Sequence, residues 1–240
     1  MKKWLVQLMR AAMGLVLLFL TAGLVWTMAA LHLYQKLPWE TMAFPAVGGF
    51  LGGLLFFTLV SRVLVVYVFG HELTHWFAAK LFLRETGDVT IGSKGGSVAV
   101  QKPNIWITLA PYFIPFYTLL WVLVYGIFRF GYGEPNSLVL KILYSGIGFT
   151  YAFHVVLTVH SLLREQADLK ANGGFLSTSL ILFFNVLLLA VGLLTATGQW
   201  RHGADQFVNK LGLEYRGVAG AVEWTWEKVM SLAAWIQSLI

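Results

Sequence analysis

The chain has 240 residues, of which 58% are hydrophobic and only 12% are charged, and it carries a formal net charge of +6. A soluble globular domain has roughly twice that share of charged residues, so a surface that faces water on all sides is excluded. No basic run interleaved with aromatic residues indicates a nucleic-acid surface, and the absence of cysteine excludes disulfides, thiolate metal ligands and a cysteine nucleophile.

The first predicted membrane crossing runs from Ala11 to Tyr34, and the basic residues Lys2, Lys3 and Arg10 precede it. Its apolar stretch is longer than the roughly 7–15 residues of a signal-peptide core, and no clean cleavage site follows. We therefore expect an uncleaved signal anchor whose amino-terminal end stays in the cytoplasm.

Apolar residues then continue from Phe44 to Leu83. As one straight helix this region would be far longer than a bilayer is thick. Two arrangements fit it: one crossing that continues as a helix into the cytoplasmic interface and breaks near Gly70, or two shorter segments divided at Arg62. The first is preferred, because it leaves Lys80 and Arg84 on the cytoplasmic side.

The polar stretch from Arg84 to Asn104 predicts a β-hairpin. Its two apolar runs, Val89–Ile91 and Val98–Val100, alternate around the glycine-rich segment Gly92–Gly96. Period-two runs with a glycine-rich turn between them are typical of hairpins.

Three further crossings are predicted, at Ile105–Phe128, Leu138–Leu163 and Phe175–Thr197. Pro111 and Pro115 are expected to kink the first of these, either as simple bends or by unwinding it and exposing backbone carbonyls. Arg129–Asn136 is expected to be a loop, and residues 164–174 form a second polar connection.

Residues 198–240 predict a tail whose apolar residues recur at helical spacing, with charged residues between them. We expect an amphipathic helix that lies in the membrane interface or packs on the bundle, with Trp224 and Trp235 as interfacial anchors. The predicted fold is an all-α polytopic membrane protein with about five transmembrane helices in residues 1–197 and a small hairpin between the second and third. We expect a multi-pass protein of an inner or plasma membrane, and the basic residues in the loops favour a hairpin that faces the cytoplasm.

The sequence His71-Glu72-Leu73-Thr74-His75 is an H-E-x-x-H motif. On a helix the two imidazoles project from one face and can share a tetrahedral zinc ion. Glu72 lies beside them, where it can take a proton from a metal-bound water and pass it to a leaving amine. Ionisable residues inside an apolar segment are costly and usually functional, so we predict a zinc site here.

The segment Gly70–Ala79 resembles the first catalytic helix of the site-2 protease family, which are intramembrane zinc metalloproteases. The predicted hairpin looks like that family's membrane-associated β-element, which offers an edge strand to an unwound substrate. The resemblance covers Phe44 to Asn185, but only the motif itself is specific. It implies a zinc-dependent membrane endopeptidase that cleaves a membrane protein or peptide in or near a transmembrane segment.

The third metal ligand is open at this point. The family supplies an aspartate from an Asn-Pro-Asp-Gly or Leu-Asp-Gly motif on a later helix, and neither occurs here. Asp168 is the leading candidate, because it alone among the aspartates begins a later crossing on the expected side. His154 and His160 compete with it, but residues six apart point about 120° from each other, so both are not expected to reach one metal. Asn185 is expected either to hold substrate or to hydrogen-bond between helices.

Two other functions are compatible with parts of this pattern. A membrane di-iron desaturase or hydroxylase would use His71 and His75 as one histidine box, but such sites need about eight histidines and the chain has six. The remaining alternative is a catalytically inactive or transport-type protein that binds metal or membrane helices without cleavage.

Overall fold

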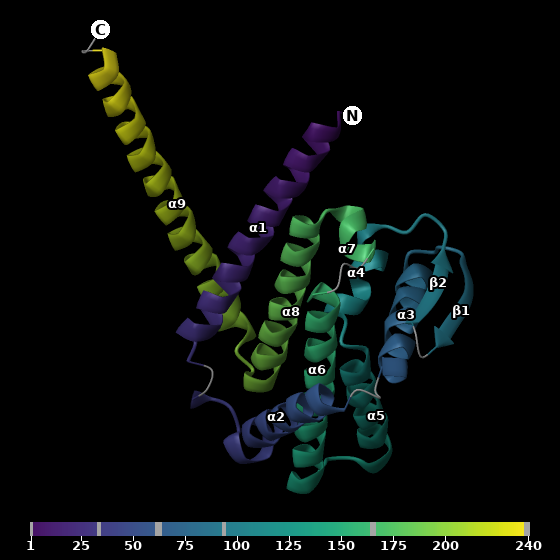
Figure 1. Ribbon diagram of the computed structural model, residues 1–240. Helices are drawn as coiled ribbons and strands as arrows, with labels where there is room; N and C mark the ends of the chain where they lie inside the picture. Colours follow the sequence, from purple (N-terminus) through teal and green to yellow (C-terminus); the bar gives the residue numbers. More distant parts are fainter. Residues whose placement is uncertain (1, 33–34, 61–63, 93–94, 164–166, 238–240) are drawn as a thin grey trace.

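The computed structural model describes residues 2–32, 35–60, 64–92, 95–163 and 167–237, and it describes their side chains up to residue 231 except for Leu64. In this part of the chain the fold is mostly helical, with one two-stranded hairpin at the side of the bundle (Figure 1), which confirms the predicted mixture of elements. The elements are α1 (Lys3–Ala30), a π-helical turn (Trp39–Ala43), α2 (Phe44–Leu59), α3 (Leu64–Leu81), β1 (Thr86–Gly92), β2 (Gly95–Val100), α4 (Ile105–Phe113), α5 (Phe116–Tyr132), α6 (Ser137–Leu163), α7 (Ala167–Asn172), α8 (Gly174–Thr197) and α9 (Trp200–Gln237).

Four of the described helical segments are long and apolar enough to cross a membrane: α1, Trp39–Leu59, α6 and α8. The pair α4 and α5 provides a fifth if it counts as one broken span, since the two helices are bent by 71° at a short break. The last two predicted crossings match α6 and α8 to within one residue at each end. The first helix begins earlier than predicted, at Lys3, and ends at Ala30; Tyr34 lies outside the described residues.

The preferred prediction of one helix from the start of α2 through the motif is wrong. α2 ends at Leu59, Val60 has an extended backbone (φ −101°, ψ 95°), and α3 starts afresh at Leu64. The N–H of Val60 still bonds to the carbonyl of Phe56 (2.9 Å), so α2 closes its last turn before the backbone becomes extended. Arg62, the alternative point of division, lies in the part of the chain that is not described. Gly70, the expected break, lies inside α3, where an added Cβ would come 2.7 Å from the ring of Tyr117.

Particular residues determine where α4 begins and where it breaks from α5. The backbone N–H of Ile107 donates to the side-chain oxygen of Asn104 (2.9 Å), which caps the start of α4. At the other end Pro115 has no N–H to continue the helix, and Ile114 before it is extended (φ −97°, ψ 107°). The predicted kink is therefore at Pro115, whereas Pro111 lies within α4 and the helix runs through it.

The hairpin prediction is confirmed. β1 and β2 pair antiparallel, with Val89 opposite Val98 and Gly92 opposite Gly95, and the register is irregular between Thr86 and Val89. The hairpin packs along α3 (Figure 1). α5 extends to Tyr132, so the predicted loop from Arg129 starts later than expected, at Gly133.

The tail is one long helix, α9, in the described residues up to Gln237. Its first turns pack on α1: a Cβ on Gly23 would meet Leu211 at 2.7 Å, and the ammonium of Lys210 lies 4.6 Å from the ring centroid of Trp26. Farther along, α9 and α1 diverge (Figure 1). The predicted helix is present, and its position relative to a membrane stays a prediction.

α4 lies at the centre of the fold, because two buried clusters meet on it. On one side Ile107 and Ala110 pack against Ala78 and Ala79 of α3. On another side α4 packs on α7 and α8, through Leu109, Tyr112, Leu169, Leu180 and Ile181. The packing of α4 therefore fixes the distance between α3, which carries the H-E-x-x-H motif, and α7.

α2 lies across α6 at very close range (Figure 1). A Cβ on Gly49 would come 2.0 Å from the carbonyl oxygen of Ser145, and a Cβ on Gly148 would come 2.0 Å from that of Ala46. Helices in an apolar environment associate through such small residues, since close backbone approach maximises van der Waals contact. Glycine is thus required on both sides of this contact.

Substitution of Gly49 by alanine is expected to destabilise the protein by about 1–3 kcal/mol, because the methyl group overlaps the α6 backbone. Gly52→Ala on the same helix is the matched control, since nothing lies within 4 Å of its Cβ position. Thermal unfolding in detergent measures both. Equal melting temperatures for the two variants would contradict the close crossing of α2 and α6.

Candidate metal centre

α3 presents the two histidines of the motif one turn apart on the same face. Their ring centroids are 4.9 Å apart, and the rings are nearly perpendicular (80°). His75 is buried and His71 is partly buried. Two imidazoles at i and i+4 with converging nitrogens are the helical arrangement that binds one metal ion.

Asp168 approaches the same point from α7. Its Oδ2 atom lies 3.8 Å from Nε2 of His71 and 3.5 Å from Nε2 of His75. Three ligands of a tetrahedral zinc ion with bonds of about 2.0–2.1 Å are separated from one another by roughly 3.3 Å. Among the described residues, His71, His75 and Asp168 are the only group of three potential ligands whose donor atoms all lie within 4.8 Å. The donor set and its spacing therefore fit a metal with one position left open.

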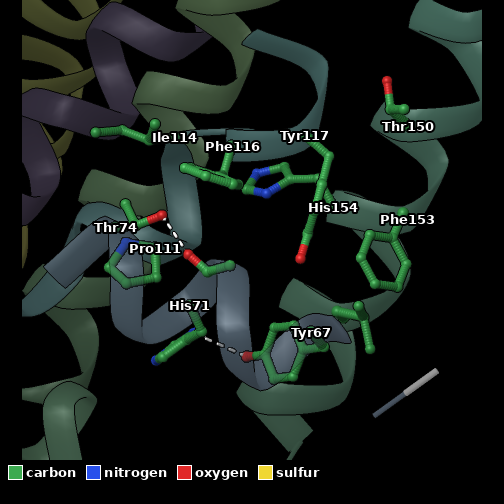
Figure 2. Close-up of a pocket in the computed structure, with 12 residues that line it drawn as sticks. Tyr67, His71, Thr74, Pro111, Ile114, Phe116, Tyr117, Thr150, Phe153 and His154 are labelled. Carbon is green, nitrogen blue, oxygen red and sulfur yellow. Dashed lines mark hydrogen bonds between the residues drawn. The ribbon is translucent and has the colours of Figure 1, made fainter. Parts of the chain in front are cut away.

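Each histidine has a partner for its other ring nitrogen. Nδ1 of His75 lies 2.8 Å from the carbonyl oxygen of Ile107, and a carbonyl only accepts, so Nδ1 carries the proton and Nε2 is free to bind a metal. Nδ1 of His71 lies 3.0 Å from the hydroxyl of Tyr67 (Figure 2), which in turn lies 2.6 Å from the hydroxyl of Ser161 on α6. Both Nε2 atoms thus face Asp168.

Pro111 explains why the Ile107 carbonyl is available. In an uninterrupted helix that carbonyl would accept the N–H of residue 111, but proline has none. The carbonyl instead accepts the imidazole N–H of His75. A helix-compatible proline four residues after Ile107 therefore supplies an acceptor that orients a motif histidine.

The break at Pro115 releases a second acceptor. The N–H of Phe116 bonds to Ile114, so it does not bond to the carbonyl of Tyr112. That carbonyl accepts from the side-chain amide of Asn185 on α8 (2.9 Å). Oδ1 of Asn185 also lies 3.2 Å from Nε2 of His154 on α6. The side-chain amide of Asn185 therefore forms hydrogen bonds between helices, which is one of the two roles predicted for it.

Tyr112 holds the third candidate ligand. Its side chain is fully buried, and its hydroxyl donates to Oδ2 of Asp168 (3.0 Å). Burial alone would raise the pKa of Asp168, but its interactions with His71 and His75 and the hydrogen bond from Tyr112 hold that pKa well below its usual range. Asp168 is therefore ionised at neutral pH, as a metal ligand must be.

Glu72 faces the same cavity from the adjacent position on α3. It is only 8% exposed, and the cavity of about 350 Å³ is also lined by His71, His75 and Asp168. The hairpin closes over it, since a Cβ on Gly96 would come 2.8 Å from Cγ of Glu72. A carboxylate thus stands beside the candidate metal ligands in a space large enough for a peptide segment.

A second, much smaller pocket lies on the other side of His71, inside the bundle (Figure 2). Its volume of about 30 Å³ is enough for a water molecule. Tyr67, Pro111 and His154 line it together with aromatic side chains. His154 is thus near the motif but bonds to Asn185, and His160 is exposed; neither belongs to the group of three.

Sequence reasoning singled out His71, Glu72, His75 and Asp168, and the fold brings all four side chains to one cavity. It missed Tyr67 and Tyr112. The position of Tyr67, four residues before His71, was a usable signal, because residues four apart share a helix face. Tyr112 carried no such signal, since its hydroxyl reaches Asp168 across 56 positions.

No family model, no curated protein and no solved structure matches this chain.

Proposed function

We propose that this chain is an integral membrane zinc metalloendopeptidase that hydrolyses a peptide bond in or near a transmembrane segment. The observation that carries the proposal is the convergence of His71, His75 and Asp168, with Glu72 in the same cavity. Two histidines and one carboxylate with an open fourth position form the ligand set of catalytic rather than structural zinc sites.

Each residue has one role in this mechanism. His71, His75 and Asp168 would hold the zinc ion, which when bound would supply a Lewis acid for the attacking water and the scissile carbonyl. Glu72 accepts the proton of the attacking water and passes it to the leaving amine. Its burial beneath β2 keeps the carboxylate directed at the cavity. Tyr112, Tyr67 and the Ile107 carbonyl hold the ligands in place.

The apolar helices support a membrane location, and the position of the site supports a membrane substrate. α7, which borders the cavity, joins α6 and α8, two helices of membrane-spanning length and composition, and the hairpin on the other border leads into the broken pair α4 and α5. Basic residues in and around these connections favour the cytoplasmic side. A peptide that leaves the bilayer there would meet both the metal ligands and water.

β2 supports an extended substrate. Gly96, Ser97, Val98 and Val100 line the cavity, and within the described residues β2 pairs only with β1. A peptide added as a strand beside β2 would satisfy its backbone groups by hydrogen bonds to β2 while it lies extended next to Glu72. A helical segment of the substrate would have to unwind before it could bind in this way. This is the role that the resemblance to the site-2 protease family assigns to its β-element.

Glu72→Gln is expected to retain bound zinc and to lose cleavage of a transmembrane test substrate by about 10²–10⁴-fold, because a general base is removed and the ligands are kept. Metal analysis and a gel assay in detergent or liposomes measure the two properties separately. Glu223→Gln on the exposed part of α9 is the control. Unimpaired cleavage by Glu72→Gln would sink the peptidase mechanism, whereas zinc without any cleavage in the wild type would favour the inactive or transport-type alternative.

Asp168→Ala is expected to lose most of its bound zinc, since it removes one of three ligands and leaves the two imidazoles facing an empty position. His160→Ala, on an exposed site of α6, should keep full occupancy. Elemental analysis of the purified proteins decides this, and it also distinguishes zinc from iron, which a two-histidine, one-carboxylate set can hold as well. Full zinc occupancy in Asp168→Ala would exclude Asp168 as a ligand.

Pro111→Ala is expected to weaken zinc binding by about 10–100-fold, as the loss of other second-layer partners does. The new N–H at position 111 would compete with Nδ1 of His75 for the Ile107 carbonyl. Competition with a chelator measures the affinity, and Pro135→Ala in the α5–α6 loop is the control. An unchanged zinc affinity would show that the freed carbonyl does not orient His75.

A further inference from the structure

α9 carries a heptad repeat that nothing in the candidate metal centre uses. Its stripe residues alternate at spacings of three and four, which is the pattern of a coiled-coil seam, and Trp224, Trp226 and Met230 add exposed apolar side chains beside the stripe. Position a is occupied by Val208, Tyr215, Val222 and Val229, and position d by Leu211, Val218 and Thr225. The sequence continues the repeat with Leu232 and Ile236, so the pattern extends over four heptads.

The seam is covered by the rest of the chain only at its beginning. Leu211 packs on α1 at Gly23. Beyond that point the stripe residues Tyr215, Val218, Val222 and Val229 are between 51% and 69% exposed. α9 has left α1 there and extends away from the bundle (Figure 1). A helix of this length with a continuous exposed seam needs a partner to bury it.

We infer that this part of α9, from Tyr215 onward, pairs with the same segment of a second copy of the chain as a parallel two-stranded coiled coil. From Tyr215 onward three of the four a positions are β-branched (Val222, Val229 and Ile236), which favours two strands, because a β-branched side chain packs well at that position in a dimer. Two copies inserted in one membrane share their orientation, and α9 runs toward the side of the molecule where α1 begins (Figure 1), so the two copies of α9 run parallel along the membrane normal. The inference does not depend on the proposed peptidase activity.

Charge distinguishes a protein partner from a lipid surface. Helices that lie on anionic lipid carry an excess of lysine and arginine on their polar face. α9 has none, since its basic and acidic residues are equal in number: Arg201, Lys210, Arg216 and Lys228 against Asp205, Glu214, Glu223 and Glu227. A helix with a heptad seam and no basic excess matches another copy of itself better than an anionic membrane surface.

The absence of cysteine allows a direct test with single introduced cysteines in the full-length protein. Val222→Cys lies on the seam and Glu227→Cys lies on the opposite face, at position f of the same heptad. Under mild oxidation in native membranes, Val222→Cys should form disulfide-linked dimers about tenfold faster than Glu227→Cys, because a disulfide needs Cα atoms within roughly 7 Å. Equal rates, or no dimer at Val222, would overturn the inference.

Two further measurements keep the result unambiguous. The mass in detergent should correspond to a dimer for the wild type and for the control Glu223→Lys/Glu227→Lys, and to a monomer for Val222→Lys/Val229→Lys with an unchanged melting temperature. Preferred cross-linking between Val218→Cys and Val222→Cys in a mixture of the two would indicate antiparallel helices and overturn the parallel pairing. A spin label attached to Val222→Cys reports whether oxygen dissolved in the lipid reaches this position. A monomeric protein whose label is accessible to that oxygen would place α9 on lipid and would also overturn the proposal.

Discussion

The arrangement of the site depends on the short helix α4, in which two backbone carbonyls have no hydrogen-bond partner within the helix. α4 contains Pro111 and is followed by Pro115, and at each of these two places a backbone carbonyl that a regular helix would use internally is left free. The carbonyl of Ile107 accepts from His75, and that of Tyr112 accepts from Asn185. In an apolar environment a free carbonyl costs several kcal/mol unless it finds a donor, so these two bonds fix α4 against α3 and α8.

Tyr112 extends the same constraint to the third candidate ligand. Its ring lies against His71 (centroids 5.2 Å apart), its hydroxyl bonds to Asp168, and its side chain is fully buried. α7 is only six residues long and could not hold an aspartate in place by itself. The packing of α4 on α7 and α8 therefore keeps the carboxylate beside the two imidazoles. α9, in contrast, touches the bundle only near its start and has no part in this network.

Much of the fold was predictable from local pattern, because the patterns were long or strongly periodic. α6, α8, the hairpin and the helical tail came from hydrophobic runs, period-two alternation and helical spacing. The continuous helix before the motif was a wrong prediction, since hydropathy cannot tell one long helix from two that turn at Val60. The proline kink was assigned to two positions, but only Pro115 breaks the helix; Pro111 lies where α4 tolerates it.

The sequence by itself determined the chemistry of the candidate site: two histidines at helical spacing with a glutamate between them inside an apolar segment. It also limited the candidates for a third metal ligand to a few residues, Asp168, His154 and His160. Only the tertiary structure brought Asp168 rather than His154 to the histidines, because that choice depends on how α7 docks on α4. The outer partners Tyr67 and Tyr112, and the free carbonyl of Ile107, follow from the same docking, since contacts across many positions leave no periodic trace in the sequence.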